Sequence, residues 1–461
     1  MVRRWGGVVV AAVLSVTFIG TARAQEQQAG QGLSVVQDQS SRDQELETIK
    51  KRLEALEKEK AERDAAKGQD PAQPKDDAAP QAPAGDANLM DPADDKNWFD
   101  RVKVGGGIRS EFRSVKDMAP NGHDYSQHFA QDNARLYVSA KVNEWISATL
   151  DTEFMATPAI LDAIAQFKVS DAFNVYTGRL LPATDRSNFD GPFYISAWDF
   201  PFLSDSFNAA TGRTGDRDDG LTVWGDVNNF KYWGGVYEGH QQAAGAPVSG
   251  HLMWAGRVQY DFFDDEKGYY LQSTYYGQKR LLAIGLAANF QQAAITPPGG
   301  RPISMGDLCV DVIWEEAMPA LGGGVPTVEV AYYYFGRHGF SNSAAPIAPD
   351  FDTGAGVGAL VSFAYLIPNQ IGWGKFQPFI RYQGFDDNVS RNARNPASTN
   401  DRRIDVGVNY IMVGHNARIS VVYTHEDFGA GAVPAYTANE FGTNNPRPQT
   451  GMFVVGTQVQ F

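Results

Sequence analysis

The chain has 461 residues, of which 43% are apolar, 20% are charged and 12% are aromatic, and it contains 47 glycines. Enrichment in glycine and aromatic residues without long apolar runs is typical of a large sheet protein and excludes a bundle of membrane-spanning helices. A net charge of −14 argues against nucleic acid as a partner. The single cysteine, Cys309, excludes an internal disulfide and a metal site built from several cysteines.

Residues 1–24 match the three-part pattern of a secretory signal peptide. Arg3 and Arg4 precede an apolar stretch over residues 8–19, and Ala22-Arg23-Ala24 provides a cleavage motif. The apolar stretch has about twelve residues, whereas a spanning helix needs about 20, so cleavage after residue 24 is favoured over a short membrane anchor. Cleavage removes three arginines, changes the net charge from −14 to −17 and predicts a protein of the cell envelope.

Residues 25–64 are expected to contain a short helix. Leu46, Ile49, Leu53 and Leu56 are spaced by three and four residues, as are the a and d positions of a coiled coil. This seam lasts only about three heptads, so the alternatives are a small oligomerisation coil and a solvated helix with accidental spacing. Residues 65–97 are rich in Ala, Pro, Asp and Gln and are expected to form a flexible linker.

From residue 98 to residue 461, apolar and polar residues alternate with the period of two that is expected of β-strands. In the first candidate strand, Val104 and Ile108 share one face, while Arg109 and Glu111 share the other. No helical pattern separates the strands, which excludes a parallel α/β sheet. Seventeen candidate strands are found, at 102–114, 133–143, 145–155, 159–169, 172–181, 219–227, 229–239, 251–262, 269–276, 280–290, 307–316, 325–336, 354–367, 375–386, 402–413, 416–427 and 450–461.

Two architectures can use such strands. A soluble sandwich places the apolar face inside, whereas a transmembrane barrel places the apolar face in lipid and the charged face in a wet lumen. The last strand favours the barrel, because it alternates up to an aromatic final residue, Phe461, as is typical of outer-membrane barrels. Aromatic residues near the ends of the apolar faces, such as Trp145 and Trp254, also favour it, because aromatic girdles mark the two membrane interfaces.

A bacterial single-chain barrel needs an even number of strands, so one of the seventeen candidates has to be removed. Long loops and tight turns alternate when the strands are counted forward or backward, and the two counts conflict between Phe262 and Arg280. Removing the candidate at 269–276 reconciles them and predicts sixteen spanning strands. The removed segment is then expected to belong to a long periplasmic turn. Sixteen strands enclose a lumen wide enough for an aqueous channel.

The longest predicted loop, residues 182–218, is the third long loop and is rich in aromatic residues, including Phe193, Trp198 and Phe207. A loop in water has little reason to hold so many rings, so we expect it to fold into the barrel and narrow the pore. The alternative is a surface loop that forms a subunit contact. The charged residues expected at the constriction are Asp185, Arg186, Asp190, Arg213 and Arg217.

Basic residues on the polar face of the strands are expected to line the pore. They are Lys103, Arg109, Arg113, Arg135, Lys141, Arg257, Arg381, Arg403 and Arg418. Rings of Arg and Lys favour anions, whereas rings of Asp and Glu favour cations. Although the whole chain is acidic, charges within a Debye length of about 8 Å dominate a narrow path. We therefore expect a weak preference for anions.

Several segments resemble the phosphate-selective porin O and P family. They are residues 178–182 (Gly-Arg-Leu-Leu-Pro), Gly212-Arg213, Gly220-Leu221, residues 405–410, residues 415–423 and residues 455–461. The resemblance covers roughly residues 98–461. It implies a trimeric, sixteen-stranded channel with an inward-folded third loop and basic residues along an anion path, such as a path for phosphate. This chain departs from that pattern because its lumen face mixes Arg and Lys with many Asp and Glu residues.

Enzyme motifs are absent or weak, since the histidines lie mainly in or beside predicted loops without HExxH spacing, and there is no GxSxG elbow. We therefore predict an all-β outer-membrane porin, a passive diffusion channel for small hydrophilic solutes or ions, without a cofactor, a metal or catalytic activity. The expected partners are outer-membrane lipid and further copies of the chain in a homotrimer, with the N-terminal segment in the periplasm. The alternatives are a barrel that sheathes or scaffolds a periplasmic partner and an outer-membrane barrel enzyme.

Overall fold

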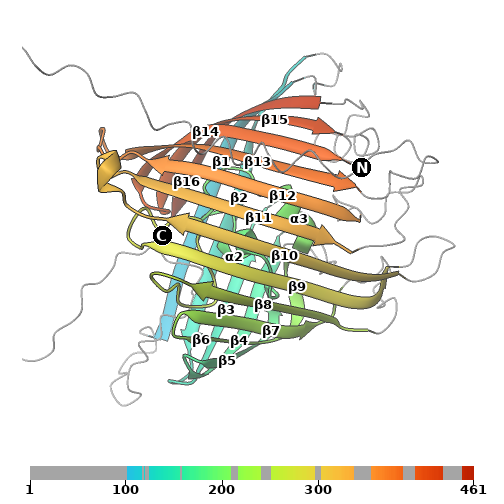
Figure 1. Cartoon of the computed structure of the whole chain (residues 1–461). Coiled ribbons are helices and arrows are strands. Elements are labelled where there is room, and N and C mark those ends of the chain that lie inside the picture. Colours follow the sequence, from blue (N-terminus) through green and yellow to red (C-terminus); the bar gives the residue numbers. More distant parts are fainter. Residues whose placement is uncertain are drawn as a thin grey trace, which may run out of the picture. The chain divides into compact units, whose positions relative to one another are not determined.

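The structure, a computed structural model, describes residues 101–116, 119, 124–155, 158–208, 216–239, 251–295, 303–336, 355–387, 400–428 and 449–461. Within these residues, sixteen antiparallel strands form a closed barrel (Figure 1). Consecutive strands are neighbours, and β1 (Val102–Val115) pairs with β16 (Gln449–Gln460) to close the sheet. The predicted all-β class and strand number are therefore confirmed. The predicted signal peptide, helix and linker lie outside the described residues.

The strand bounds lie close to the predicted ones, with one main exception at β2. The strands between β1 and β16 are β2 (Ser126–Lys141), β3 (Ile146–Glu153), β4 (Ala159–Ser170), β5 (Phe173–Leu180), β6 (Asp218–Val227), β7 (Phe230–Tyr237), β8 (Met253–Asp261), β9 (Leu281–Ile295), β10 (Ile303–Glu315), β11 (Val325–Phe335), β12 (Gly356–Leu366), β13 (Lys375–Asp387), β14 (Asp401–Val413) and β15 (Ala417–Phe428). No strand forms at 269–276, as predicted.

The predicted start of the second strand at residue 133 is wrong, because β2 begins at Ser126. Residues 126–132 lack a regular apolar alternation, yet they continue the ladder with the end of β1, where Val115 pairs with Ser126. β9 and β10 likewise extend into the loop predicted at 291–306. Backbone hydrogen bonds continue the sheet beyond the apolar band, and hydropathy alternation does not report on them.

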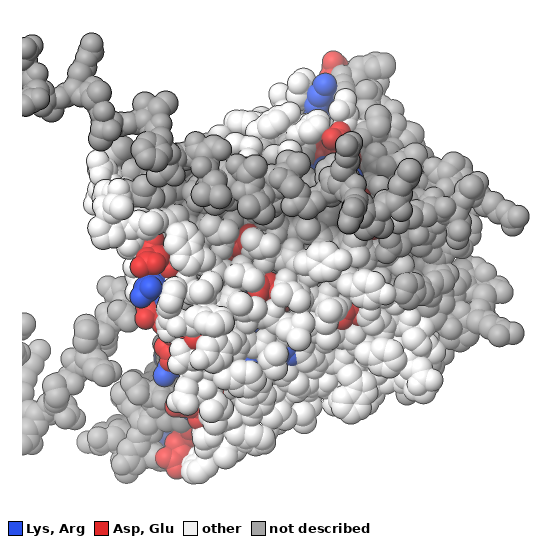
Figure 2. Space-filling view, in the orientation of Figure 1, with Lys and Arg blue, Asp and Glu red and all other residues white. Residues whose placement is uncertain are grey.

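The surface of the barrel is inverted relative to that of a water-soluble protein. Along β1, Ile108 is 51% exposed while its neighbour Arg109 is 1% exposed. The same contrast recurs in β15, where Val421 is exposed and Arg418 is buried. Figure 2 shows the outer wall as a broad, mostly uncharged face with a few charged spots, and with Lys, Arg, Asp and Glu gathered along its left edge. An apolar band on the outside and charges on the inside are the arrangement of a barrel in lipid.

Two connections fold into the lumen, one from each end of the barrel. We define the third loop as residues 181–217, which contain α2 (Arg186–Asp190) and α3 (Phe202–Asn208), and Figure 1 shows both helices among the strands. We define the crossbar as residues 262–280, which join β8 to β9 at the end of the barrel where the short turns lie. The remaining described helix, η4 (Pro319–Leu321), is a single turn. None of the helices described is long and apolar enough to cross a membrane.

Candidate functional site: the constriction of the lumen

Glycines in the wall receive large side chains of the third loop. A Cβ atom added at Gly456 of β16 would lie 2.5 Å from the indole of Trp198. A Cβ atom added at Gly107 of β1 would lie 2.7 Å from the ring of Phe193. Real Cβ atoms essentially never show such distances, so these two glycines are positions at which the loop lies directly against the wall. The described part of the loop is inside the barrel rather than on its surface.

Asp199 connects the third loop to two arginines of the wall. Its carboxylate accepts a hydrogen bond of 2.8 Å from Nη2 of Arg113 and one of 2.5 Å from Nη2 of Arg403. Burial would raise the pKa of Asp199, but the two guanidinium groups hold it below its usual range. Arg403 also binds Asp405, which receives a further hydrogen bond from Arg381. These arginines are therefore compensated by carboxylates.

Trp198 lies between two arginines that are less fully compensated. The guanidinium carbon of Arg109 is 4.0 Å from the Trp198 ring centre, and that of Arg418 is 5.9 Å from it. Arg109 binds Asp132 at 3.1 Å and donates to the Trp198 carbonyl at 2.5 Å. Arg418 donates to the Ile195 carbonyl and to Gln458, and its buried Nη2 has no hydrogen-bond partner. Two arginines therefore flank the ring of Trp198, while the Glu111 carboxylate accepts a hydrogen bond of 2.6 Å from its Nε1.

The first part of the third loop is bound on the opposite arc of the wall. The Asp185 carboxylate accepts hydrogen bonds from Ser204 at 2.7 Å, from Tyr333 of β11 at 2.8 Å and from Thr184 at 3.0 Å. Burial raises the pKa of Asp185 to about 6, although these hydrogen bonds act against the shift. Nearby, Arg257 of β8 binds Asp311 at 2.5 Å and 2.7 Å, which buries another wall arginine in an ion pair.

A small cavity lies between the wall, the third loop and the crossbar. Its volume is about 30 Å³, and it is lined by Arg135 and Tyr137 of β2, residues 188–194, Arg217, and Tyr270 and Leu271 of the crossbar. A water molecule needs roughly 10–15 Å³ of such space, so the cavity holds about two. Residues of the wall, the loop and the crossbar thus line it together.

The cavity carries both signs of charge. Arg217 donates to Asp162 of β4 at 3.0 Å, and Arg135 lies 3.6 Å from Glu153 of β3. Asp190 is buried, and neither of its carboxylate oxygens has a hydrogen-bond partner. Burial raises the pKa of Asp190 well above its usual value, although the charge of Arg186 acts against the shift. The lining of the cavity therefore combines two arginines that are paired with carboxylates of the wall and one acid, Asp190, whose carboxylate has no hydrogen-bond partner.

The structure brings most of the candidate site residues together. Asp185, Arg186, Asp190 and Arg217 all lie in the lumen, whereas Arg213 is outside the described residues. Seven of the nine expected pore-lining residues point inward and contact carboxylates, amides or loop carbonyls, namely Arg109, Arg113, Arg135, Arg257, Arg381, Arg403 and Arg418. Lys103 is exposed and Lys141 half-buried at the end of the barrel with the short turns.

Sequence reasoning missed several residues that shape the site. Asp199, which anchors the loop, and Tyr137, which lines the cavity, are not among the residues expected at the site. The segment around residues 269–276 is expected to belong to a long periplasmic turn, and in the structure Tyr269 and Tyr270 of this turn are drawn into the lumen. The signal that predicted the inward third loop, a run of aromatic residues in a connection, was also present in the crossbar.

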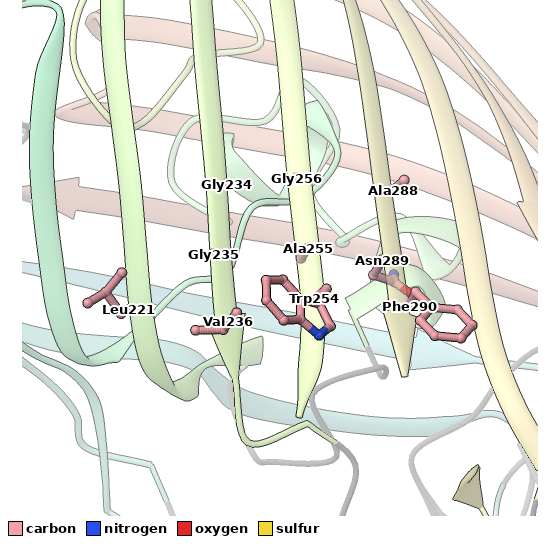
Figure 3. A pocket seen from close by; sticks show the side chains of 10 residues that line it. All are labelled: Leu221, Gly234, Gly235, Val236, Trp254, Ala255, Gly256, Ala288, Asn289 and Phe290. Atoms are coloured by element: carbon pink, nitrogen blue, oxygen red, sulfur yellow. The ribbon is translucent and has the colours of Figure 1, made fainter. Parts of the chain in front are cut away.

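A wide groove on the outer wall is not part of this site. It has a volume of about 530 Å³ and lies on the outer wall between β6 and β9. Figure 3 shows Leu221, Val236, Trp254 and Phe290 around Gly234 and Gly256. Its lining is almost entirely apolar, and it lacks the convergent polar groups that mark a solute site. Among the residues that the structure describes, no group of three or more His, Cys, Asp or Glu is arranged to hold a metal ion.

Solved structures with a similar fold are outer-membrane proteins. An anion-selective porin from Comamonas acidovorans is similar with a TM-score of 0.51 and 12% identity, over 78% of this chain and 99% of that chain. OprB of Pseudomonas putida, in a structure at high pH, is similar with a TM-score of 0.52 and 10% identity, over 78% of this chain and 94% of that chain. At such low identity the likeness shows the fold alone, which is porin-like.

No protein-family model matches the chain, and no curated protein matches it. The resemblance to the phosphate-selective porin O and P family is therefore not confirmed, while the broader porin-like architecture is.

Proposed function

We propose that the protein is an outer-membrane porin that lets small hydrophilic solutes or ions diffuse passively. The single observation that carries the proposal is the inverted barrel, with an apolar wall outside and a charged lumen inside, narrowed by the third loop to a cavity of about 30 Å³. In the conformation described, such a cavity admits water and small ions, and larger solutes need a displacement of the loop. The short turns would face the periplasm.

The filled lumen argues against a barrel that sheathes a periplasmic carrier. Side chains and backbone carbonyls of the third loop contact β1, β8, β11, β14, β15 and β16, so little free volume is left for an inserted protein. Catalysis is not part of the proposal, because the described lumen joins its charged groups in ion pairs and hydrogen bonds rather than presenting a nucleophile beside a base.

Channel activity is tested by reconstituting the full chain into planar bilayers and measuring single-channel current. We expect discrete conductance steps, smaller than those of an open sixteen-stranded pore. Liposome swelling with sugars of increasing size would measure the exclusion limit, with heat-unfolded protein as the control. Folded, inserted protein that passes neither ions nor sugars would overturn the proposal.

A preference for anions is the finer proposal, and Arg109 and Arg418 around Trp198 support it. Arg418 is buried and donates to an amide and a carbonyl rather than to a carboxylate among its described hydrogen bonds, so no direct ion pair cancels its charge there. Asp190 acts in the opposite direction if it is ionised. The reversal potential in a salt gradient decides between the two, and Arg418→Gln should shift it toward cations. A wild-type channel that is already selective for cations would contradict the preference for anions.

We also propose a homotrimer, on the basis of the family resemblance in the sequence. Mass measurement of the complex in detergent before and after heating tests this, and a monomer at all protein concentrations would contradict it. The outcome does not affect the channel proposal, since each barrel is closed by its own β1 and β16.

A further inference from the structure

We propose that the crossbar is a second constriction element, which enters the lumen from the end opposite to the third loop and clamps that loop in place through Glu266. This inference rests on the proposed channel function and adds the residues that fix the width of the pore. Nothing in the fold requires such an element, since the other connections described at this end, such as residues 142–145 and 414–416, are short turns.

Glu266 and Arg186 form the centre of the clamp. Arg186 of α2 donates from Nη1 to Oε2 of Glu266 at 2.9 Å and from Nη2 to Oε1 at 2.6 Å. The same Nη2 donates to the carbonyl of Gln272, also in the crossbar, at 2.6 Å. Both charged side chains are almost completely buried. A bidentate pair of this kind fixes orientation as well as distance between the two segments.

The Glu266 side chain is fully satisfied by further donors. Gln259 of β8 and Tyr275 of the crossbar each donate to its carboxylate at 2.9 Å. Lys231 of β7 donates to its backbone carbonyl. Burial would raise the pKa of Glu266, but the charges of Arg186 and Lys231 and the hydrogen bonds lower it to about 2. The carboxylate therefore stays ionised and paired throughout the neutral range.

Aromatic packing extends the contact between the crossbar and the loop. The ring centre of Tyr269 lies 5.5 Å from that of Phe189 in α2 and 5.6 Å from that of Trp224 in β6. The Tyr269 hydroxyl donates to the carbonyl of Leu181, the first residue of the third loop, at 2.6 Å. The backbone N–H of Leu271 donates to the carbonyl of Phe189 at 3.3 Å. The loop is thus held at its start and at α2.

The far part of the crossbar is attached to a different region of the wall. Glu315 of β10 accepts hydrogen bonds from the Thr274 hydroxyl at 2.6 Å and from the N–H groups of Tyr275 at 3.0 Å and Gly277 at 2.9 Å. A ring nitrogen of His415, in the turn between β14 and β15, lies 2.9 Å from the Thr274 carbonyl. With Tyr270 bonded to Asp162 of β4 at 3.2 Å, the segment bridges the lumen from one side to the other.

The clamp affects the width of the small cavity. Tyr270 and Leu271 of the crossbar line the small cavity together with Arg135 of the wall and with Phe189 and Asp190 of the clamped loop. If the ion pair is weakened, α2 and the crossbar can separate, and the cavity widens. Breaking one partner of a buried pair is costly because the other charge stays buried without compensation. Glu266 is therefore a positioning residue for the pore.

The test compares Glu266→Gln with Asp265→Asn in planar bilayers, using the full chain. Both changes remove one acidic charge from neighbouring positions of the crossbar, but the Asp265 side chain is 43% exposed and its described ion pair is with the exposed Lys267 at 3.3 Å. We expect Glu266→Gln to increase single-channel conductance by about twofold or more and to add open-channel noise, while Asp265→Asn matches wild type. Equal currents in all three proteins would overturn the clamp.

A second, milder pair keeps the test decisive if Glu266→Gln does not assemble. Tyr269→Phe removes only the hydroxyl that binds the Leu181 carbonyl, whereas Tyr232→Phe removes a hydroxyl that binds Ala172 in a short turn away from the loop. Increased current noise in Tyr269→Phe alone supports the clamp, and identical records contradict it. A wild-type protein that does not conduct would reject the channel function itself, which distinguishes the two failures.

Discussion

The indole of Trp198 occupies the space directly above Gly456, so that a Cβ atom there would lie 2.5 Å from the ring. The contact joins the third loop to the last strand, 258 positions later in the chain by the residue numbers. The wall of the barrel is therefore shaped to receive the loop. A substitution in the wall should accordingly be able to displace the loop.

Gly456→Ala should displace Trp198 and loosen the third loop. The added methyl group forces the ring to move, and overpacking of this kind costs about 1–3 kcal/mol. We expect the variant to unfold at a lower temperature, as measured by the shift in gel migration on heating. We also expect its single-channel conductance to change. Gly256→Ala is the matched control, because its Cβ would meet only the Trp233 carbonyl oxygen at 3.5 Å. An unchanged Gly456→Ala protein would show that the loop does not rest on this strand.

Asp199→Asn should weaken the attachment of the third loop to Arg113 of β1 and Arg403 of β14. The change leaves Arg113 and Arg403 short of one negative charge, and loss of one partner from a buried ionic cluster costs about 3–5 kcal/mol. Unfolding in urea or by heating measures the loss. Asp386→Asn, in an exposed pair with Arg402 at 3.2 Å, should change stability by less than about 1 kcal/mol. Similar losses in both variants would contradict the anchoring role of Asp199.

Ile108→Arg and Arg109→Ala should have opposite consequences. Ile108 is exposed on the outer wall, where an arginine near the bilayer midplane costs roughly 2–4 kcal/mol, so outer-membrane levels should fall. Arg109 faces the lumen beside Trp198, so its loss should leave assembly intact and shift the reversal potential. Membrane fractionation and bilayer recording measure the two effects. If the arginine at 108 were tolerated and the alanine at 109 blocked assembly, the outer face of β1 would be misassigned.

The folded protein should lose stability in acid through His415. Burial lowers the pKa of this side chain to about 3, while Arg418 also disfavours its charged form. Between about pH 6.5 and pH 3 the unfolded chain therefore binds a proton that the folded chain does not, and stability falls as pH falls, by up to about 1.4 kcal/mol per pH unit. Tyr194 and Tyr276 pack against the ring and would have to accommodate the charge.

The measurement is the unfolding temperature of wild type and His415→Gln at several pH values. The variant should show a flatter dependence below pH 6.5, whereas His425→Gln, at a position whose side chain is 42% exposed, should follow wild type. Parallel curves for wild type and His415→Gln would mean that His415 is not the group that responds.

The sequence by itself determined the strands, their number and the side to which each residue points. Alternation with period two separates Ile108 from Arg109 without reference to any partner, because successive side chains of a strand leave opposite faces. Strand parity removed the candidate at 269–276 for a similar reason, since a closed antiparallel sheet in one chain has to be even. The aromatic content of the third loop predicted that the loop turns inward.

Only the tertiary structure decided which inward residues meet. Alternation places Arg113 and Arg403 on the lumen face, but closure of the barrel brings both to Asp199. The pairing of Arg186 with Glu266 likewise joins two connections that enter from opposite ends, separated by three strands. Such contacts depend on how loops pack inside a closed wall, which is a property of volume and charge compensation in three dimensions. A periodic pattern along one strand carries no information about them, because it fixes the direction of a side chain and not its partner.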